Sequence, residues 1–291
     1  MERVAIAGLG LIGGSLGLAL RRELPEVEVL GLARRQETAD TAMRMDAVTA
    51  ASTDPAILSG ADLVVVAVSL AETNAMLDLV AAHAGPGARV TDVGSVKANV
   101  VDHAAAVLDP AVNPFLGGHP MAGKEVSGLE NAEADLFLGR PWVLTPRPGT
   151  DMDAFNDLVQ AVEAIGARVL LLEPEVHDRY VALVSHLPFL LSAAYLLAVK
   201  EQPHWTDAAG LASSGFRDIT RLGAGDPAMY AAIAAGNREE VLGTWAAMHE
   251  ALDQLEAAIV RDEGETLAAL LEEARRTRAE WLAAHPEAAA G

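Results

Sequence analysis

The sequence lacks cysteine altogether and is poor in basic residues, and both absences limit the function. None of its 291 residues is cysteine, which excludes disulfides, thiolate zinc sites and cysteine nucleophiles and is compatible with a cytoplasmic protein. Only 21 lysines and arginines stand against 41 aspartates and glutamates, a formal net charge of −20. Phosphate backbones and anionic membranes bind basic surfaces, so we expect neither nucleic acid nor a membrane as partner, and we predict no metal site.

Long uncharged apolar runs are also scarce, and we interpret neither of two such runs as a membrane segment. Val4–Leu20 contains five glycines, which suits a strand, turn and helix better than a signal peptide. Val181–Val199 approaches the roughly 20 residues that span a bilayer. Because it contains His186 and Pro188, we interpret it as a helix buried inside protein, at a subunit interface.

A glycine-rich turn follows a short strand near the start of the chain. The β-branched and alanine run Arg3–Ala7 leads into GLGLIGGS at Gly8–Ser15 and then into an apolar helical pattern. A dinucleotide site requires this order, because glycines allow the pyrophosphate to come close and the helix N-terminus offers it backbone amides. The predicted cofactor contacts are Gly8, Gly10, Leu11, Ile12 and Gly13.

The residues after the second strand, Glu28–Ala33, bear on the choice of coenzyme. An NAD-preferring site usually places an acid there for the ribose hydroxyls, but this sequence has Ala33 followed by Arg34 and Arg35. Guanidinium groups bind a 2′-phosphate through paired hydrogen bonds, so we predict NADP, with NAD as the alternative. The arginines could instead form a solvated helix start. Ser69, after the next apolar strand, is also predicted to contact the cofactor.

Strands and helices continue to alternate up to Glu173-Pro174, where the strand pattern ends. The order predicts a Rossmann-type, doubly wound and mostly parallel α/β domain over residues 1–173 and an all-α domain over residues 174–291. Further predicted strands are Asp62–Val68, Arg89–Val93, Trp142–Thr145 and Arg168–Leu172, and predicted helices are Glu37–Met45, Glu72–Ala82, Glu130–Phe137 and Met152–Ile165.

The stretch Phe115–Gly128 carries the first candidate for catalysis. His119 follows two glycines at the end of a short strand, and Pro120 stiffens the exit. An imidazole with an ordinary pKa of about 6.5 suits proton transfer at neutral pH, although a lone histidine is more often a hydrogen-bonded structural residue. Ser95 and Lys97 follow the neighbouring strand at the same sheet edge, and Ser95 could also be the N-cap of the next helix.

The C-terminal part contains two further polar groups and an apolar seam. Pro188 cannot donate a helical hydrogen bond, so the helix should kink near His186 and aim that ring inward. Arg217 and Arg221 are four residues apart on one helix face, which suits a carboxylate grip or, alternatively, a solvated ion-pair face with Asp218. A seam that requires a partner helix, and could form a dimer, contains Val241, Trp245, Met248, Leu252, Leu255 and Ile259.

Six motifs occur in one order: GLGLIGGS at Gly8–Ser15, DVGSVK at Asp92–Lys97, GGHPMAG at Gly117–Gly123, HD at His177-Asp178, SHLP at Ser185–Pro188 and SGFRDITR at Ser214–Arg221. In this combination the chain resembles the prephenate and arogenate dehydrogenases of tyrosine biosynthesis. The first motif alone is shared by many dehydrogenases, whereas the whole set is specific.

The resemblance implies an enzyme that oxidises the 4-hydroxyl of a cyclohexadiene while the ring carboxylate leaves as carbon dioxide. His119 would accept the hydroxyl proton as hydride moves to the nicotinamide, with Ser95 hydrogen-bonded in the same cluster. Arg221 would hold a substrate carboxylate, and Glu125 would line the entrance. The predicted substrate-binding set is completed by His186, Arg217 and Lys97. Prephenate carries two carboxylates, which explains basic residues within the motifs of an acidic protein.

Other interpretations stay open at this point. Tyr230, Ser214 and Lys124 replace Trp, Gly and Thr of some relatives, so prephenate and arogenate are both candidate substrates. Another reductase of a small keto or hydroxy acid, or a non-catalytic NADP(H)-binding sensor, would share the two-domain plan. We expect no room for a fused mutase or amino-acid-sensing domain, so tyrosine inhibition is expected to act by competition in the active site.

Overall fold

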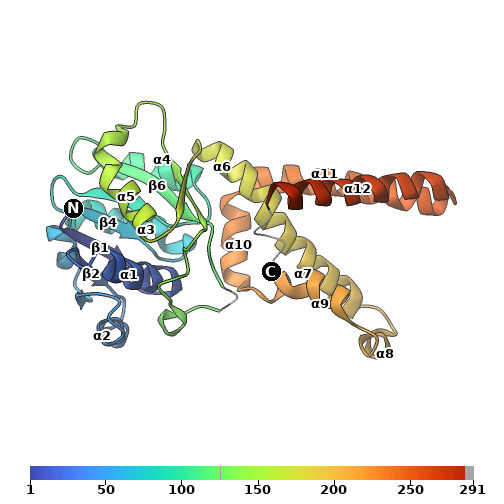
Figure 1. Cartoon of the computed structure of the whole chain (residues 1–291), viewed down its shortest axis with the longest axis horizontal. Coiled ribbons are helices and arrows are strands. Elements are labelled where there is room, and N and C mark those ends of the chain that lie inside the picture. The colour runs from blue at the N-terminus through green and yellow to red at the C-terminus, as the bar shows by residue number, and fades with distance from the viewer. Residues whose placement is uncertain (125, 286–291) are drawn as a thin grey trace. The chain divides into compact units, whose positions relative to one another are not determined.

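The structure is a computed structural model that describes residues 1–124 and 126–285. The chain divides into two compact units, Met1–Val241 and Leu242–Gly291. The first contains a β-sheet with its covering helices and the shorter helices that follow it, and the second is helical (Figure 1).

The first unit is organised by an eight-stranded sheet with the strand order β3-β2-β1-β4-β5-β6-β7-β8. Every neighbouring pair is parallel except β6 and β7, which confirms the predicted doubly wound, mostly parallel sheet. The strands are β1 (Arg3–Ala7), β2 (Glu28–Leu32), β3 (Ala50–Ser52), β4 (Leu63–Val66), β5 (Arg89–Asp92), β6 (Phe115–Pro120), β7 (Pro141–Thr145) and β8 (Arg168–Leu171).

Helices cover the sheet and also form the region after it. The sheet-covering helices are α1 (Leu11–Glu23), α2 (Gln36–Arg44), α3 (Leu70–His83), α4 (Ala98–Val107) and α5 (Asn156–Ala164). After β8 come α6 (Pro174–Val181), α7 (Leu187–Lys200), α8 (Trp205–Ala209), α9 (Ser214–Thr220) and α10 (Pro227–Gly236). Shorter helices are the 3-10 helices η1 (Pro55–Gly60), η2 (Leu129–Asn131), η3 (Met152–Phe155) and η5 (Arg221–Ala224), and the π-helix η4 (Ala182–His186).

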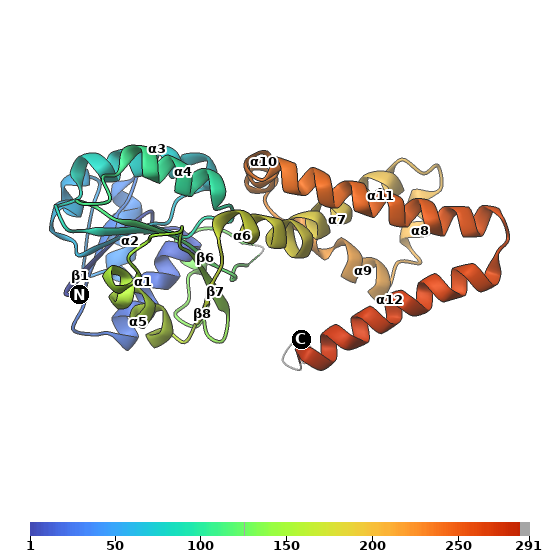
Figure 2. The same ribbon diagram turned by 90° about the horizontal axis from the view of Figure 1, so that it is seen from above.

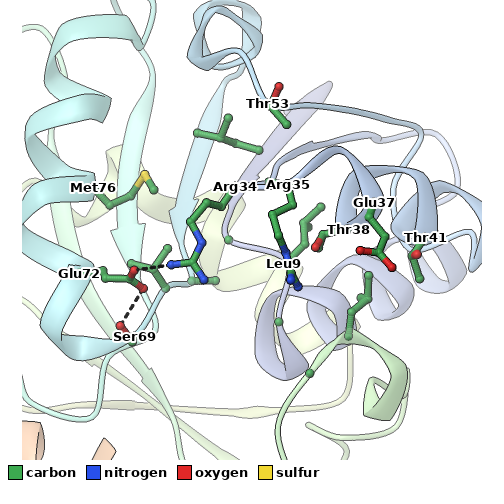
Figure 3. Close-up of a pocket in the computed structure, with 18 of the residues that line it drawn as sticks. Leu9, Arg34, Arg35, Glu37, Thr38, Thr41, Thr53, Ser69, Glu72 and Met76 are labelled. Carbon is green, nitrogen blue, oxygen red and sulfur yellow. Dashed lines mark hydrogen bonds and ion pairs between the residues drawn. The ribbon is translucent and has the colours of Figure 1, made fainter. Parts of the chain in front are cut away.

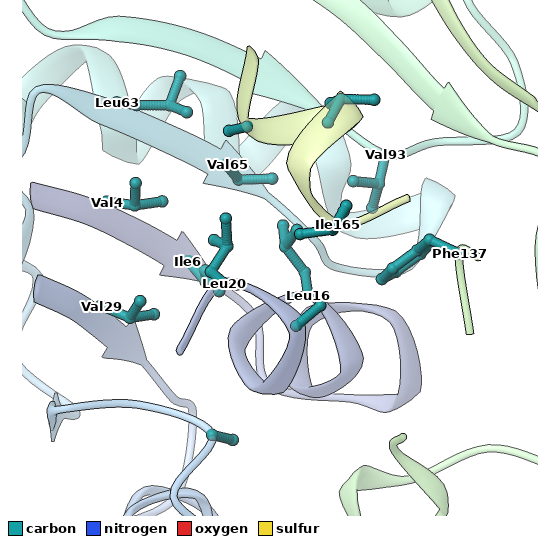
Figure 4. Close-up of a cluster of buried hydrophobic side chains, with 14 of the residues drawn as sticks. Val4, Ile6, Leu16, Leu20, Val29, Leu63, Val65, Val93, Phe137 and Ile165 are labelled. Carbon is teal, nitrogen blue, oxygen red and sulfur yellow. The ribbon is translucent and has the colours of Figure 1, made fainter. Parts of the chain in front are cut away.

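Both faces of the sheet are buried, which explains the near-continuous apolar strands. Along β1, Val4 and Ile6 join one hydrophobic cluster, whereas Ala5 and Ala7 join the other. Figure 4 shows the first cluster, in which Leu16 of α1 faces the strands. Figure 2 shows α1 and α5 on one side of the sheet and α3 and α4 on the other. This burial holds the carboxyl ends of the strands rigidly at one edge.

One predicted element is wrong. Residues 130–137 do not form a helix, since only the 3-10 turn at Leu129–Asn131 is helical there. Leu129 and Phe137 are buried instead by irregular chain packed near α1, and the hydroxyl of Ser15 accepts a hydrogen bond from the backbone of Glu133 at 3.0 Å. Tertiary contacts therefore replace the helical hydrogen bonds that local propensity favoured.

The helical segment after β8 is interrupted where Pro188 predicts a disturbance. The α-helical pattern of α6 changes to the π-helix η4 before α7 begins, and His186, the last residue of η4, is 3% exposed. The inward orientation predicted for that ring is confirmed. The predicted domain boundary after Glu173 falls where the sheet ends and α6 begins, and as a boundary it stays a prediction.

Part of this segment is not buried by the chain itself. Pro174–Lys200 is apolar and long enough to cross a membrane by length and composition alone, and 33% of its most apolar window is buried. Leu183, Val184 and Leu197 are 60%, 65% and 57% exposed. A single chain therefore does not bury these side chains, and the predicted burial of the helix at a subunit interface stays a prediction.

The second unit contains α11 (Arg238–Val260) from Leu242 onward and the whole of α12 (Gly264–Ala284). Two predicted seam residues, Leu252 and Ile259, are 50% and 64% exposed. Among the described residues, the predicted seam is therefore only partly covered.

Candidate active site

The glycine turn brings two backbones together and leaves one position open. Gly8 has a φ of +109°, and a Cβ added to it would lie 2.5 Å from the carbonyl oxygen of Ala67. A Cβ on Gly13 would lie 2.0 Å from the carbonyl oxygen of Gly8. At Gly10, by contrast, an added Cβ meets nothing within 4 Å. Gly8 and Gly13 thus serve the fold, whereas Gly10 keeps the surface before α1 open to a ligand.

A cavity of about 840 Å³ lies beside this turn. It is large enough for a nucleotide-sized ligand, and it opens at the carboxyl ends of β1 and β2, where doubly wound sheets bind ligands. Leu11, Ile12 and Gly13 are not among the residues that line it. The predicted cofactor-binding residues that do line it are Gly8, Gly10, Arg34, Arg35 and Ser69.

The basic residues after β2 point into this cavity from its edge (Figure 3). Arg34 Nη1 lies 3.1 Å from Glu72 Oε1, and the Ser69 hydroxyl donates to Glu72 Oε2 at 2.8 Å. The Arg34 side chain remains 83% exposed, so its pairing with Glu72 is a surface ion pair of little strength. Arg35 also lines the cavity. An anionic ligand could therefore recruit both guanidinium groups.

His119 is the last but one residue of β6 and begins a buried chain of hydrogen bonds. Its ring is 9% exposed, and its Nδ1 lies 2.8 Å from Nε2 of His177 on α6. His177 Nδ1 in turn lies 2.8 Å from Asp178 Oδ1. Burial, followed by repulsion from His177, Lys97 and His186, holds the pKa of His119 well below its ordinary value of 6.5. The ring is therefore neutral at neutral pH and able to accept a proton.

The structure does not place Lys97 where a substrate could touch it. Its side chain is fully buried, and Nζ donates to the Asp92 carboxylate and, at 2.8 Å, to the carbonyl oxygen of Gly118. Burial lowers the pKa of Lys97, and the neighbouring Asp92 opposes that shift. The predicted contact with substrate is corrected accordingly, because the Lys97 ammonium group instead links Asp92 of β5 to Gly118 of β6, the residue before His119.

Ser95 does not cap the helix that follows it. The carboxylate of Asp178 accepts from the backbone amides of Lys97 at 2.7 Å and Ala98 at 2.9 Å, and the N-cap position of α4 is Lys97. The N-cap interpretation of Ser95 is therefore wrong. Ser95 is partly buried in the loop between β5 and α4, next to the strand that carries His119.

His186 belongs to the same buried group through Asn237. The amide of Asn237 donates to the backbone oxygen of Asp178 at 2.7 Å and lies 3.3 Å from His186 Nδ1. Burial lowers the pKa of His186 to about 4, with attraction to Asp178 opposing the shift and His177 adding to it. Asn237 carried no signal in the sequence, because an asparagine between two helices is usually a cap.

The predicted carboxylate grip lies at the surface of the single chain. Arg217 is 76% exposed, and its Nε lies 3.2 Å from Asp218 Oδ1, as the ion-pair alternative predicted. Arg221 is exposed at the start of η5. Glu125 lies outside the described residues.

Sequence reasoning gave no role to His177 and Asp178, although the pair appeared as one of the motifs. The only available signal was their adjacency near the start of the predicted helical region, which does not reveal that this segment lies against the ends of β5 and β6. Their contacts with His119 and α4 bridge 58 to 81 residues of sequence.

A Rossmann-type sheet, a glycine turn beside a nucleotide-sized cavity and a buried neutral histidine at the same sheet edge define a nicotinamide-dependent oxidoreductase. The family model "Prephenate dehydrogenase, nucleotide-binding domain" matches residues 16–171, and "Prephenate dehydrogenase, dimerization domain" matches residues 173–273. The chain belongs to the prephenate dehydrogenase family, which confirms the resemblance of its motifs.

Individual relatives agree over almost the whole chain. The prephenate dehydrogenase of Bacillus subtilis is 32% identical over 276 residues, which is 91% of this chain and 72% of the relative. The crystal structure of prephenate dehydrogenase from A. aeolicus with hydroxyphenyl propionate and NAD+ is 30% identical, with a TM-score of 0.90 over 96% of this chain and 98% of that one. Synechocystis arogenate dehydrogenase is 33% identical, with a TM-score of 0.84 over 96% and 100% of the two chains.

Proposed function

We propose that this protein catalyses the oxidative decarboxylation of prephenate to 4-hydroxyphenylpyruvate in tyrosine biosynthesis, with hydride transfer to NAD+ or NADP+. The observation that carries the proposal is His119, a buried neutral imidazole at the carboxyl end of β6. Because β6 continues the parallel sheet from β5, His119 lies at the same edge as the glycine turn after β1. Base and nucleotide site thus lie at the same edge of the sheet.

The chain itself supplies the base of the proposed reaction. When bound, the nicotinamide accepts the hydride. His119 takes the proton of the ring hydroxyl, so that the forming carbonyl carries no positive charge, and such general-base assistance typically contributes about 10²–10⁴ in rate. The carbon–carbon bond to the ring carboxylate then breaks, carbon dioxide leaves, and its electron pair completes the aromatic ring.

Substrate recognition is proposed for residues around this base. Ser95 would donate a hydrogen bond beside His119, and His186, whose ring is buried in the same group, would contribute a polar contact. Arg221 would hold a carboxylate of the substrate, supported by the accessibility of its side chain in η5 and the strength of guanidinium–carboxylate pairs. Arg217 is proposed to bind substrate as well, and Glu125 is proposed to line the entrance of the site.

The direct test combines the purified protein with prephenate or arogenate and with either nucleotide, following the absorbance of reduced nicotinamide. We expect turnover with prephenate, and at least about 10²-fold slower turnover with the His119→Asn variant. Turnover with arogenate alone would redirect the assignment to an arogenate dehydrogenase, an alternative supported by the similarity to the Synechocystis enzyme. Nucleotide binding without turnover of either substrate would support a sensor protein instead.

NADP as the preferred coenzyme rests on Arg34 and Arg35, which line the cavity after β2 where Ala33 replaces an acid. Replacing both arginines with alanine should weaken NADP much more than NAD, because only NADP carries the 2′-phosphate that they would bind. Arg44→Ala is the matched control, since this arginine lies in the last turn of α2 and does not line the cavity. Equal losses for the two nucleotides would contradict the preference.

Assembly and location complete the proposal. We place the protein in the cytoplasm as a homodimer formed through its C-terminal helices. The match of residues 173–273 to a dimerisation domain and the exposed apolar side chains of α7 and α11 support the dimer.

A further inference from the structure

We propose that His177 and Asp178 are positioning residues that hold His119 in the one tautomer able to act as a base. This inference rests on the proposed function, because it assigns a role within the same proton transfer. Three side chains form an unbroken buried series: His119 Nδ1 lies 2.8 Å from His177 Nε2, and His177 Nδ1 lies 2.8 Å from Asp178 Oδ1.

The tautomers follow from the carboxylate end of the series. An ionised carboxylate only accepts hydrogen bonds, so His177 must carry its proton on Nδ1 and donate it to Asp178. In the proposed series His177 carries only that proton, so the lone pair on its Nε2 accepts the Nδ1 proton of His119. With its proton on Nδ1, His119 has a lone pair on Nε2. Nε2 is the ring nitrogen left to take the hydroxyl proton of the substrate.

The orientation of Asp178 is fixed independently of the two histidines. Its carboxylate accepts from the amides of Lys97 at 2.7 Å and Ala98 at 2.9 Å, so it caps α4 and lies at the positive end of that helix. His177 is fully buried and meets His119 edge to face, with ring centroids 5.0 Å apart. The rings therefore have a rigid support in a backbone element, which a histidine pair alone would lack.

The same series compensates charge during the reaction. The O–H bond of the substrate breaks, an N–H bond forms at His119 Nε2, and the ring becomes an imidazolium. The Nδ1 proton of His119 remains hydrogen-bonded to His177, and the proton of His177 remains hydrogen-bonded to Asp178. Through His177, the negative charge of the Asp178 carboxylate therefore stabilises the positive charge on His119. The other groups near His119 do not do this, because Lys97 is cationic and paired with Asp92, and His186 is neutral with a pKa of about 4.

The first experiment reads the tautomer directly and needs no substrate. In the protein with isotopically labelled histidine rings, nitrogen chemical shifts distinguish Nδ1–H from Nε2–H, and the His119→Asn variant assigns the signal. We expect His119 to be Nδ1–H in the wild type and a mixture of tautomers in His177→Leu, which removes the acceptor. A wild-type ring that is Nε2–H would overturn the inference whatever the substrate proves to be.

The second experiment separates positioning from a structural role. With the substrate that the enzyme turns over, His177→Leu should lower kcat by about 10- to 100-fold while leaving the substrate KM and the nucleotide Kd near wild type, because only the base is disturbed. His177→Gln should recover part of kcat, since its side-chain oxygen can accept the His119 proton. The control is His103→Gln, because His103 forms a surface pair with Asp78 at the same 2.8 Å distance.

The outcomes are distinct for the inference and for the proposed function. Full kcat in a folded His177→Leu protein would overturn the positioning role. If that variant does not fold, the wild-type tautomer and the kcat of His177→Gln decide, and a wild-type kcat in His177→Gln with mixed tautomers would count against the role. A correct tautomer without turnover of prephenate or arogenate would leave the geometry standing and reject the reaction.

Discussion

Three imidazoles at the candidate active site are buried, and they differ in the groups that surround them. His119 and His186 have lowered pKa values because burial disfavours the charged ring, whereas His177 is bonded directly to the carboxylate of Asp178. A histidine whose pKa lies near or below the ambient pH is available as a base without prior deprotonation. Burial, and not the residue type alone, therefore sets these three rings apart from the other five of the eight histidines.

The role of His119 predicts a specific kinetic loss. His119→Asn should lower kcat by at least about 10²-fold, because the amide cannot take the hydroxyl proton, while the nucleotide Kd and the unfolding temperature remain close to wild type. Steady-state kinetics and nucleotide titration measure the two effects. His103→Asn, at the surface of α4, provides the control. A variant with full turnover would remove His119 as the base.

The lowered pKa of His186 predicts how stability depends on pH. The unfolded ring titrates at 6.5 and the folded ring at about 4, so the unfolded state binds more protons between these values. This contribution to stability is present above pH 6.5 and is lost as the pH falls towards about 4. His119 contributes in the same direction.

Thermal unfolding followed from about pH 7 to about pH 4.5 tests this contribution. The unfolding temperature of the wild type should fall more steeply than that of His186→Gln, which has no titrating ring at this position. Parallel curves for the two proteins would show that folding does not lower the pKa of His186.

At the scale of elements, the site depends on where strands end and helices begin. The glycine turn joins β1 to α1 with almost no space between the backbones, and the carboxylate of Asp178 on α6 caps α4. The π-helix η4 then turns His186 inward. Each functional group is thus supported by the junction of two regular elements, which fixes it more firmly than a long loop would.

The glycine turn offers a test that separates folding from ligand binding. Gly8→Ala should destabilise the protein without ligand, because the backbone has a φ of +109° and the new Cβ would lie 2.5 Å from the carbonyl oxygen of Ala67. Gly10→Ala should leave unfolding nearly unchanged, because its Cβ meets nothing within 4 Å, but it should weaken nucleotide binding since Gly10 lines the cavity.

Thermal unfolding without ligand and nucleotide titration provide the two readouts. A Gly10→Ala protein that binds nucleotide like wild type would show that the ligand does not approach this part of the turn. A Gly8→Ala protein of unchanged stability would contradict the close backbone contact.

At the scale of the whole molecule, a single chain leaves apolar side chains uncovered in the region after the sheet. Leu183, Val184 and Leu197 are each more than half exposed, as are Ile259 and Val260 at the end of α11. Exposed apolar surface of this kind marks an interaction site in soluble proteins. Together with the match to a dimerisation domain, it supports the proposed homodimer.

Association is tested by placing a charge on α7. Leu197→Glu should shift the protein from dimer towards monomer, because the 57% exposed leucine would become a carboxylate in an apolar interface. Light scattering after size-exclusion chromatography measures the mass at several concentrations. Met43→Glu on α2 is the control, an apolar side chain 40% exposed on the nucleotide-binding part. A wild-type monomer, or equal behaviour of the two variants, would contradict an interface through α7.

The sequence alone determined the sheet, the glycine turn and the identity of the candidate base. Apolar strands, glycines at Gly8 and Gly10 and the His119 turn act through local geometry and patterning, which neighbouring residues record directly. The family motifs added the reaction, and the matches to prephenate dehydrogenases confirm that family.

Only the tertiary structure decided the partners of those residues. Lys97 is buried against Asp92, and α4 is capped by Asp178 and not by Ser95. Residues 130–137 pack as irregular chain and do not form the predicted helix. The physical reason is that burial and hydrogen bonding depend on groups far apart in the chain. A carboxylate that lies 80 residues beyond the amide it caps leaves no trace in the local pattern around that amide.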